Sequence, residues 1–312
     1  MSNQRKRSNQ QKRQERFNEL SINLGFYTNY RGQFACPICL MLFNSIDELS
    51  DAHIVPQAMG GSLVTITCKK CNNEVGSTIE SYEIERAKFN RTFSGDGKNS
   101  WSVSLYPLHS NKESGKVIAN MRLIEDGQKQ TYEFKIIPRQ YSPAALNEII
   151  KSLMNPGGGF NVNLWAKAGW RRARLTYLHS AFLFLFDQFG YEWALNPCTT
   201  LIREQIQKPQ EDLISFNTIE LFKFSGDLTK PSVNLIVQPK ESKGFLVIFP
   251  QLAHWELPVA VWMPLFDSPY KLPEEVSNLR IEPLPRLNSH LSTLDSVWLG
   301  HKFAQAISLL AI

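Results

Sequence analysis

Two neighbouring stretches of the sequence decide the fold: ACPICLMLFNSIDELSDAHIVPQAMGG at residues 35–61 and TCKKCNNEVG at residues 67–76. Each contains two cysteines separated by two residues. The four are Cys36, Cys39, Cys68 and Cys71. A spacing of two residues lets both thiolates of a pair reach one ion from a single tight turn, and four thiolates form a closed tetrahedral site. The pattern therefore predicts a structural Zn²⁺ site.

The alternatives for these cysteines are weaker. A redox-active dithiol is the alternative for either pair alone, but the presence of two pairs favours a shared metal. Disulfides are disfavoured if the chain resides in a reducing compartment. The fifth cysteine, Cys198, lies far from the others in the sequence, and we expect it to be an ordinary buried residue.

The residues between and after the cysteine pairs predict a hairpin followed by a helix. Ile54 and Val55 suit a strand, Pro56 and the Gly60-Gly61 pair break it, and residues 62–67, SLVTIT, suit a returning strand. After the second pair, Ser77 and Glu80 have the spacing of a capping box, which predicts a helix that continues to about Phe89. The expected order is knuckle, hairpin, second knuckle and helix.

This arrangement resembles the HNH endonucleases. The resemblance rests on AHIVPQAMGG at residues 52–61 and on CKKCNNEVG at residues 68–76, and it covers about residues 36–80. It implies a zinc-stapled ββα-metal finger of treble-clef type. It also implies hydrolysis of phosphodiester bonds with one divalent ion, Mg²⁺ or Mn²⁺, and a nucleic-acid substrate, DNA with RNA not excluded.

The resemblance also implies roles for single residues. His53 becomes the general base, a role that suits a side chain whose ordinary pKa is about 6.5. Asn72 occupies the position of the final metal ligand, and Asn73 would orient His53 or a phosphate. Ala52 stands where the family usually has an acidic residue or histidine. Asp51, two residues before His53 and on the same strand face, is the candidate to replace that ligand.

Two other interpretations stay open. A non-catalytic treble-clef module that binds nucleic acid is favoured by Ala52 and by the lack of a middle asparagine, where the chain offers only Ser62, Thr65 and Thr67. A structural zinc domain for protein contacts is the other, with His53 stacking on the knuckle or capping the hairpin. Defence against foreign DNA, such as restriction, would fit a stand-alone HNH nuclease, but only by analogy of fold.

The N-terminal segment carries the whole charge imbalance of the chain. Residues 1–16 hold six basic residues and one acidic residue, which accounts for the net charge of +5. The segment is almost free of apolar residues, so we expect a disordered basic tail. It is interpreted either as an arm that contacts nucleic-acid phosphates or as a solubilising tail.

The remaining sequence predicts a mixed α+β region. Its expected features are a turn-rich break at residues 94–100, a hairpin turn at 125–130, helices at 142–154, 164–191 and 296–311, and strands at 101–108, 116–126, 130–138, 218–224, 233–238, 244–250 and 259–265. The last half of the helix at 164–191 is apolar nearly all round and is expected to be the buried centre of the second domain.

The fold class that follows is α+β. We expect a basic tail at residues 1–16, an HNH/zinc domain at 17–95 and an accessory domain of unknown role at 96–312. No run of about eighteen apolar residues is present, so no membrane span is expected. The N-terminus lacks the apolar segment of a secretory signal, which predicts a cytoplasmic protein.

Overall fold

The computed structural model describes most of the chain. The described residues are 2–93, 100–108, 115–126, 129–164, 170–214, 218–220, 230–238, 243–250, 259–266 and 280–283. None of the helices in these ranges combines the length and hydropathy that a bilayer-spanning segment needs. Most of the expected break at 94–100, part of the turn at 125–130 and the whole expected helix at 296–311 lie outside the described residues.

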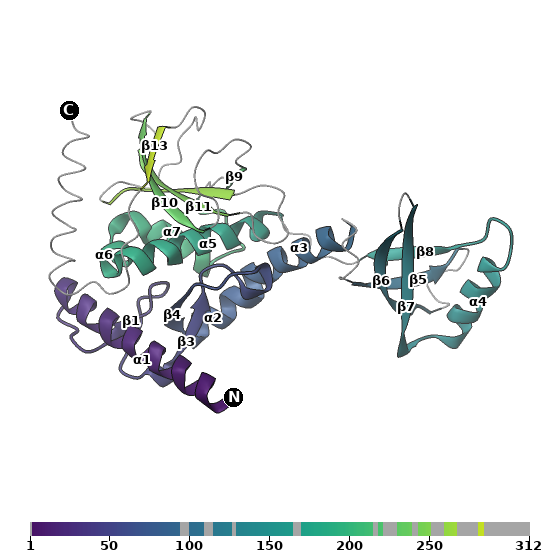
Figure 1. Ribbon diagram of the computed structural model, residues 1–312, viewed down its shortest axis with the longest axis horizontal. Coiled ribbons are helices and arrows are strands. Elements are labelled where there is room, and N and C mark those ends of the chain that lie inside the picture. Colours follow the sequence, from purple (N-terminus) through teal and green to yellow (C-terminus); the bar gives the residue numbers. More distant parts are fainter. Residues whose placement is uncertain are drawn as a thin grey trace. The chain divides into compact units, whose positions relative to one another are not determined.

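The chain forms two compact units, each of mixed helices and strands (Figure 1). One consists of Met1–Glu83 with Trp170–Ile312, and the other of Ile84–Gly169. The division into a domain at 17–95 and a domain at 96–312 stays a prediction, because these units follow backbone contacts and not function.

The N-terminal segment is helical, which differs from the expected disorder. Helix α1 runs over Ser2–Tyr27. Phe17, Leu20 and Leu24 are buried, at a spacing of three and four residues that forms one helix face. This short apolar stripe begins directly after the basic segment, so the composition of residues 1–16 alone does not reveal it. Strand β1 (Phe34–Ala35) contacts α1, and so does β4 (Val64–Cys68).

The segment after α1 folds in the predicted order of knuckle, hairpin, knuckle and helix. β1 pairs antiparallel with β2 (Leu42–Phe43) around the first cysteine pair. A short 3-10 turn η1 (Ile46–Glu48) leads into β3 (Leu49–His53), which pairs antiparallel with β4. A second turn, η2 (Gln57–Met59), lies in the loop between them. Strand β3 ends at His53, before the predicted Ile54 and Val55.

The glycine pair that closes the hairpin loop has a steric reason. Gly60 has φ 91°, in the left-handed region that glycine adopts without strain. A Cβ on Gly61 would lie 1.8 Å from the carbonyl oxygen of Val55. Because two backbone segments touch there, a side chain on Gly61 would push the loop away from the residues that directly follow His53.

The helix after the second cysteine pair begins earlier than its capping box suggests. α2 (Lys69–Val75) starts directly after Cys68, whose sulfur caps it by accepting the N–H of Cys71. A π-helical segment η3 (Gly76–Glu80) and α3 (Ser81–Phe93) continue it. The sequence β3, β4, α2 is the ββα arrangement expected of the finger.

The rest of the first unit surrounds one buried helix. α5 (Trp170–Phe189) begins later than predicted and ends before Gly190, as expected. Short helical segments follow: α6 (Tyr191–Ala194), η5 (Pro197–Thr199) and α7 (Thr200–Gln207). The side chains of α5 from Leu175 to Phe186 are buried on every side. This confirms the expectation of a central helix in the core.

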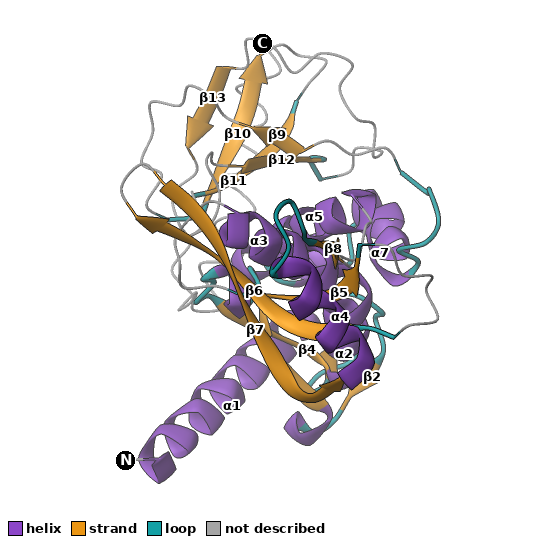
Figure 2. Ribbon diagram, turned by 90° about the vertical axis from the view of Figure 1, so that its right-hand side faces the viewer, coloured by secondary structure: helices purple, strands orange, loops and turns teal. Residues whose placement is uncertain are grey.

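One face of α5 lies against a five-stranded antiparallel sheet (Figures 1 and 2). Its order is β13-β10-β11-β12-β9. The strands are β9 (Thr218–Glu220), β10 (Ser232–Gln238), β11 (Gly244–Phe249), β12 (Val259–Met263) and β13 (Arg280–Pro283). Every residue of β11 and β12 is buried, as expected for the two apolar runs.

The second unit is a four-stranded antiparallel sheet with one helix. Its order is β7-β6-β5-β8, and β6 and β7 form a long twisted ribbon (Figure 2). The elements are β5 (Trp101–Pro107), β6 (Val117–Asp126), β7 (Lys129–Tyr141), α4 (Pro143–Leu153) and β8 (Phe160–Leu164). Ser142 caps α4 through the N–H of Ala145, as its position before Pro143 predicts. β8 ends at Leu164, the first residue of the helix predicted at 164–191, and residues 165–169 lie outside the described residues.

Candidate metal centre and nuclease site

The four cysteines predicted to bind zinc come together in the fold. The sulfur atoms of Cys36, Cys39, Cys68 and Cys71 all lie within 4.8 Å of one another, and none forms a disulfide. The turn around β1 and β2 supplies the first pair, and the start of α2 supplies the second. This cluster, the cysteine site, is buried except at Cys39.

The spacing of the sulfur atoms fits a tetrahedral ion. Bonds of about 2.3 Å from zinc to each sulfur place neighbouring sulfurs about 3.8 Å apart. The Cys39 and Cys68 sulfurs are 3.9 Å apart. Backbone groups support the cluster, since the Cys68 N–H donates to the Cys36 sulfur at 3.5 Å and the Cys71 N–H to the Cys68 sulfur at 3.4 Å. The donor set and geometry both suit Zn²⁺.

Electrostatics explain why these thiols need a cation. Burial raises the pKa of Cys36 well above its ordinary value. A hydrogen bond from Cys36 lowers the pKa of Cys39. Without a bound cation, Cys36 therefore keeps its proton more readily than Cys39 does. A bound Zn²⁺ would let all four act as thiolates.

The predicted general base lies at the end of the hairpin. His53 is the last residue of β3, is half-buried, and lies opposite Val64 of β4. The next residue, Ile54, is fixed by its N–H bond to the Leu63 carbonyl at 3.0 Å. His53 therefore belongs to an ordered strand end with its side chain partly open to solvent.

Asp51 shares a strand face with His53, as the sequence spacing predicts. Both are half-buried, and the residue between them, Ala52, is only 2% exposed. An acidic side chain at position 52 would point into the interior. Asp51 is therefore the acidic residue that the fold places beside His53.

Helix α2 brings the predicted amides to the same strand. The Asn72 side-chain N–H donates to the backbone carbonyl of Asp51 at 3.3 Å. This fixes Asn72 against β3 and leaves its amide oxygen available. Asn73, one position further along the helix, is exposed. The structure thus brings Asn72 to β3, whereas Asn73 faces solvent.

The Asp51 carboxylate already has a partner that sequence reasoning missed. The guanidinium of Arg13 in α1 binds it with two hydrogen bonds, from Nε to Oδ1 at 2.8 Å and from Nη2 to Oδ2 at 2.9 Å. Both side chains are partly exposed, at 30% and 35%. The sequence identifies Arg13 only as one of six basic residues in the N-terminal segment. Nothing in that segment predicts which acidic side chain Arg13 pairs with.

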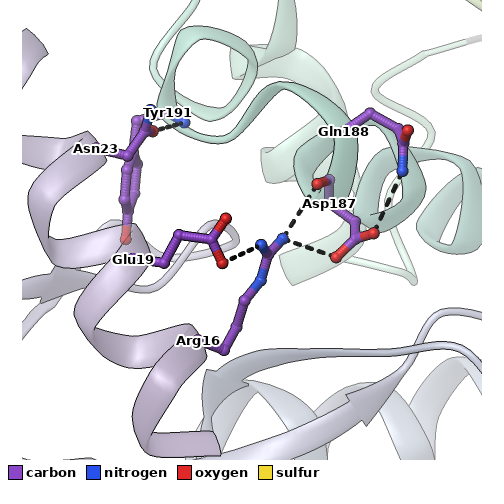
Figure 3. A network of polar contacts seen from close by, with 6 residues as sticks. All are labelled: Arg16, Glu19, Asn23, Asp187, Gln188 and Tyr191. Carbon is purple, nitrogen blue, oxygen red and sulfur yellow. Dashed lines mark hydrogen bonds and ion pairs between the residues drawn. The ribbon is translucent and has the colours of Figure 1, made fainter. Parts of the chain in front are cut away.

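Helix α1 is held firmly on the C-terminal side of this contact. Arg16, one turn after Arg13, pairs with Asp187 of α5 at 2.7 Å and with Glu19 at 2.8 Å (Figure 3). The Asn23 side chain accepts the backbone N–H of Tyr191 at 2.8 Å (Figure 3). The basic helix is therefore a fixed part of the first unit.

A second ion does not fit as readily as zinc. Among the described residues, the cysteine site is the only group of three or more His, Cys, Asp or Glu donors arranged to hold one ion. The oxygens of Asp51 and Asn72 are of the type that Mg²⁺ prefers. The Asp51 carboxylate is engaged by Arg13, however, so it fits a metal only if Arg13 moves. The assignment of Asp51 and Asn72 as metal ligands stays a prediction.

Comparison with known proteins supports the resemblance. Residues 36–87 match the family model described as HNH endonuclease. No curated protein and no solved structure is significantly similar to the chain. The matched segment contains the cysteine site, the hairpin, α2, η3 and the first half of α3.

Proposed function

We propose that this chain, which carries an HNH domain at residues 36–87, is an endonuclease that hydrolyses phosphodiester bonds in DNA, with His53 as general base. The observation that carries the proposal is the position of His53. It ends the first strand of a zinc-type ββα finger, half-exposed, on the same face as Asp51. A solvent-accessible imidazole on an ordered strand end can take a proton from an attacking water.

Each part of the finger has its own task in this mechanism. The cysteine site holds the two knuckles together, and Gly60-Gly61 keep the loop after His53 closed. Asn72 fixes α2 against β3 at Asp51, two residues before the base. A divalent ion such as Mg²⁺ or Mn²⁺, when bound, would stabilise negative charge on the leaving oxygen. Asp51 and Asn72 are the residues that could hold it.

The test is a plasmid-nicking assay with Mg²⁺ or Mn²⁺ on the wild type and on His53→Ala. We expect the variant to lose roughly a hundredfold or more of the nicking rate, because general-base catalysis contributes about that much. Zinc content and DNA affinity should be unchanged. Val64→Ala is the matched control, since it alters the cross-strand neighbour of His53 without removing a functional group. Equal nicking by wild type and His53→Ala would place the base elsewhere.

A non-catalytic module that binds nucleic acid is the second candidate. Thr65 and Thr67, where a middle asparagine could stand, are buried and pair with Ala52 and Ser50 on the face opposite His53. They supply no polar group beside the base. Absence of nicking with either ion, together with DNA binding that depends on salt, would favour this candidate.

A further inference from the structure

We propose that Arg13 is a ligand for DNA phosphate beside His53, and that Asp51 positions it. This proposal rests on the DNA-directed function proposed above and adds a residue from outside the matched segment. It also gives Asp51 a role different from that of a metal ligand.

The pairing leaves Arg13 able to bind a second anion. A guanidinium has five N–H donors in a rigid plane. Asp51 takes one from Nε and one from Nη2, on the same edge of the plane. The two donors on Nη1 and the second donor on Nη2 are not used by this pair. With 30% of the side chain exposed, the group can receive a phosphate oxygen on its outer edge.

The position of the guanidinium is close to the predicted base. Asp51 and His53 are two residues apart on one face of β3, which separates their backbones by about 7 Å. The guanidinium lies 2.8 Å from the Asp51 carboxylate. A phosphate that accepts a hydrogen bond from Arg13 would therefore lie next to the face of β3 that carries Asp51 and His53.

The helix that carries Arg13 is preorganised. Phe17, Leu20 and Leu24 bury one face of α1. Arg16 lies one turn after Arg13 and pairs with Asp187, which fixes α1 to α5. Because the backbone and the carboxylate together hold the guanidinium, little side-chain freedom remains to be lost when a phosphate binds.

The first arm of the test measures binding of a short fluorescein-labelled DNA duplex to the full-length protein by anisotropy, in EDTA. We expect Arg13→Ala and Arg13→Gln to weaken binding roughly tenfold to a hundredfold, the range of a hydrogen bond to a charged group. Lys12→Ala is the matched control, since it removes the same charge from an adjacent, exposed position. It should weaken binding less than about threefold. Zinc content and melting temperature should not change.

The second arm separates positioning from simple charge. Asp51→Asn removes a negative charge, so general electrostatics predict tighter DNA binding. If Asp51 positions Arg13, the variant should instead bind about threefold to tenfold more weakly in EDTA. Asp47→Asn, an exposed acid two residues before β3, is the control and should bind equally or more tightly.

Each outcome decides the proposal. Equal losses in Arg13→Ala and Lys12→Ala, or unchanged or tighter binding by Asp51→Asn, would overturn it. Tighter binding of single-stranded RNA with the same dependence on Arg13 would overturn the choice of DNA. The proposed nuclease is tested separately: nicking by the wild type with no specific effect of Arg13 leaves the nuclease and removes this inference. A specific effect of Arg13 on DNA binding, together with no nicking by the wild type, supports this inference and removes the proposed nuclease.

Discussion

The first unit contains two buried groups of ionisable side chains, and they differ in how their charge is balanced. The cysteine site draws all four ligands from residues 36–71. The second group, the acid cluster, joins the helix after the hairpin to α5. In it, Oε1 of Glu80 lies 3.6 Å from Nδ1 of His179, and the Tyr177 hydroxyl donates a hydrogen bond to the Glu83 carboxylate. The cysteine site suits a metal ion, whereas the acid cluster adjusts by proton uptake and release.

The pKa values in the acid cluster show this adjustment. Burial raises the pKa of Glu80 from 4.5 to about 7. Burial also lowers the pKa of His179 from 6.5 to about 4. Both shifts favour the neutral form in the folded protein. The contrast teaches that the cysteine site calls for a cation to balance its thiolates, whereas the acid cluster is buried with neutral carboxyl and imidazole groups.

The largest predicted effect tests the cysteine site, the first of the two groups. Cys68→Ala removes a zinc ligand and the sulfur that caps α2. Since apparent zinc-binding energies are about 10 kcal/mol or more, the segment at 36–87 should lose its zinc and unfold. Elemental analysis and limited proteolysis measure this. Cys198→Ala, at a buried cysteine outside the cluster, should keep about one zinc per chain. Retention of zinc by Cys68→Ala would refute the four-cysteine site.

The same contrast explains what the sequence could predict. The cysteine site follows from spacing alone, because two residues between cysteines fix a local turn. The shared strand face of His53 and Asp51 follows from their spacing of two residues, whereas the role of His53 was predicted from the family resemblance. The partners of Glu80 and Asp51 do not, since His179 and Arg13 come from helices far away in the chain. A long-range ion pair has no local signature, so such contacts appear only once the helices are packed.

A smaller effect tests the acid cluster. The raised pKa of Glu80 means that its contribution to stability is full below about pH 4.5 and is lost as the pH rises to about 7. The lowered pKa of His179 acts oppositely, with stability present above about pH 6.5 and lost as the pH falls to about 4. The two slopes should nearly cancel in the wild type.

Glu80→Gln should remove this compensation. Near pH 7 and above, the variant should gain up to about 3 kcal/mol of unfolding free energy, because it no longer buries a carboxylate. Relative to the wild type, its stability should then fall on acidification from about pH 7 to about pH 4.5. Denaturant unfolding at several pH values measures the difference. Glu74→Gln, at an exposed acid of α2, should match the wild type throughout. Parallel profiles for Glu80→Gln and wild type would contradict the shift.

The smallest predicted effect concerns backbone strain in the first knuckle, at Leu40. Leu40, next to Cys39, has φ 58°, the left-handed conformation that costs a residue with a Cβ about 1 kcal/mol or more. Leu40→Gly should relieve that cost, and the glycine's greater freedom when unfolded offsets part of it, so the net gain should stay below about 1 kcal/mol. Met41→Gly is the control, because Met41 is exposed and has no positive φ, and it should destabilise. Denaturant unfolding of the zinc-bound protein would show opposite signs for the two variants. If both destabilise, the backbone at Leu40 is not strained.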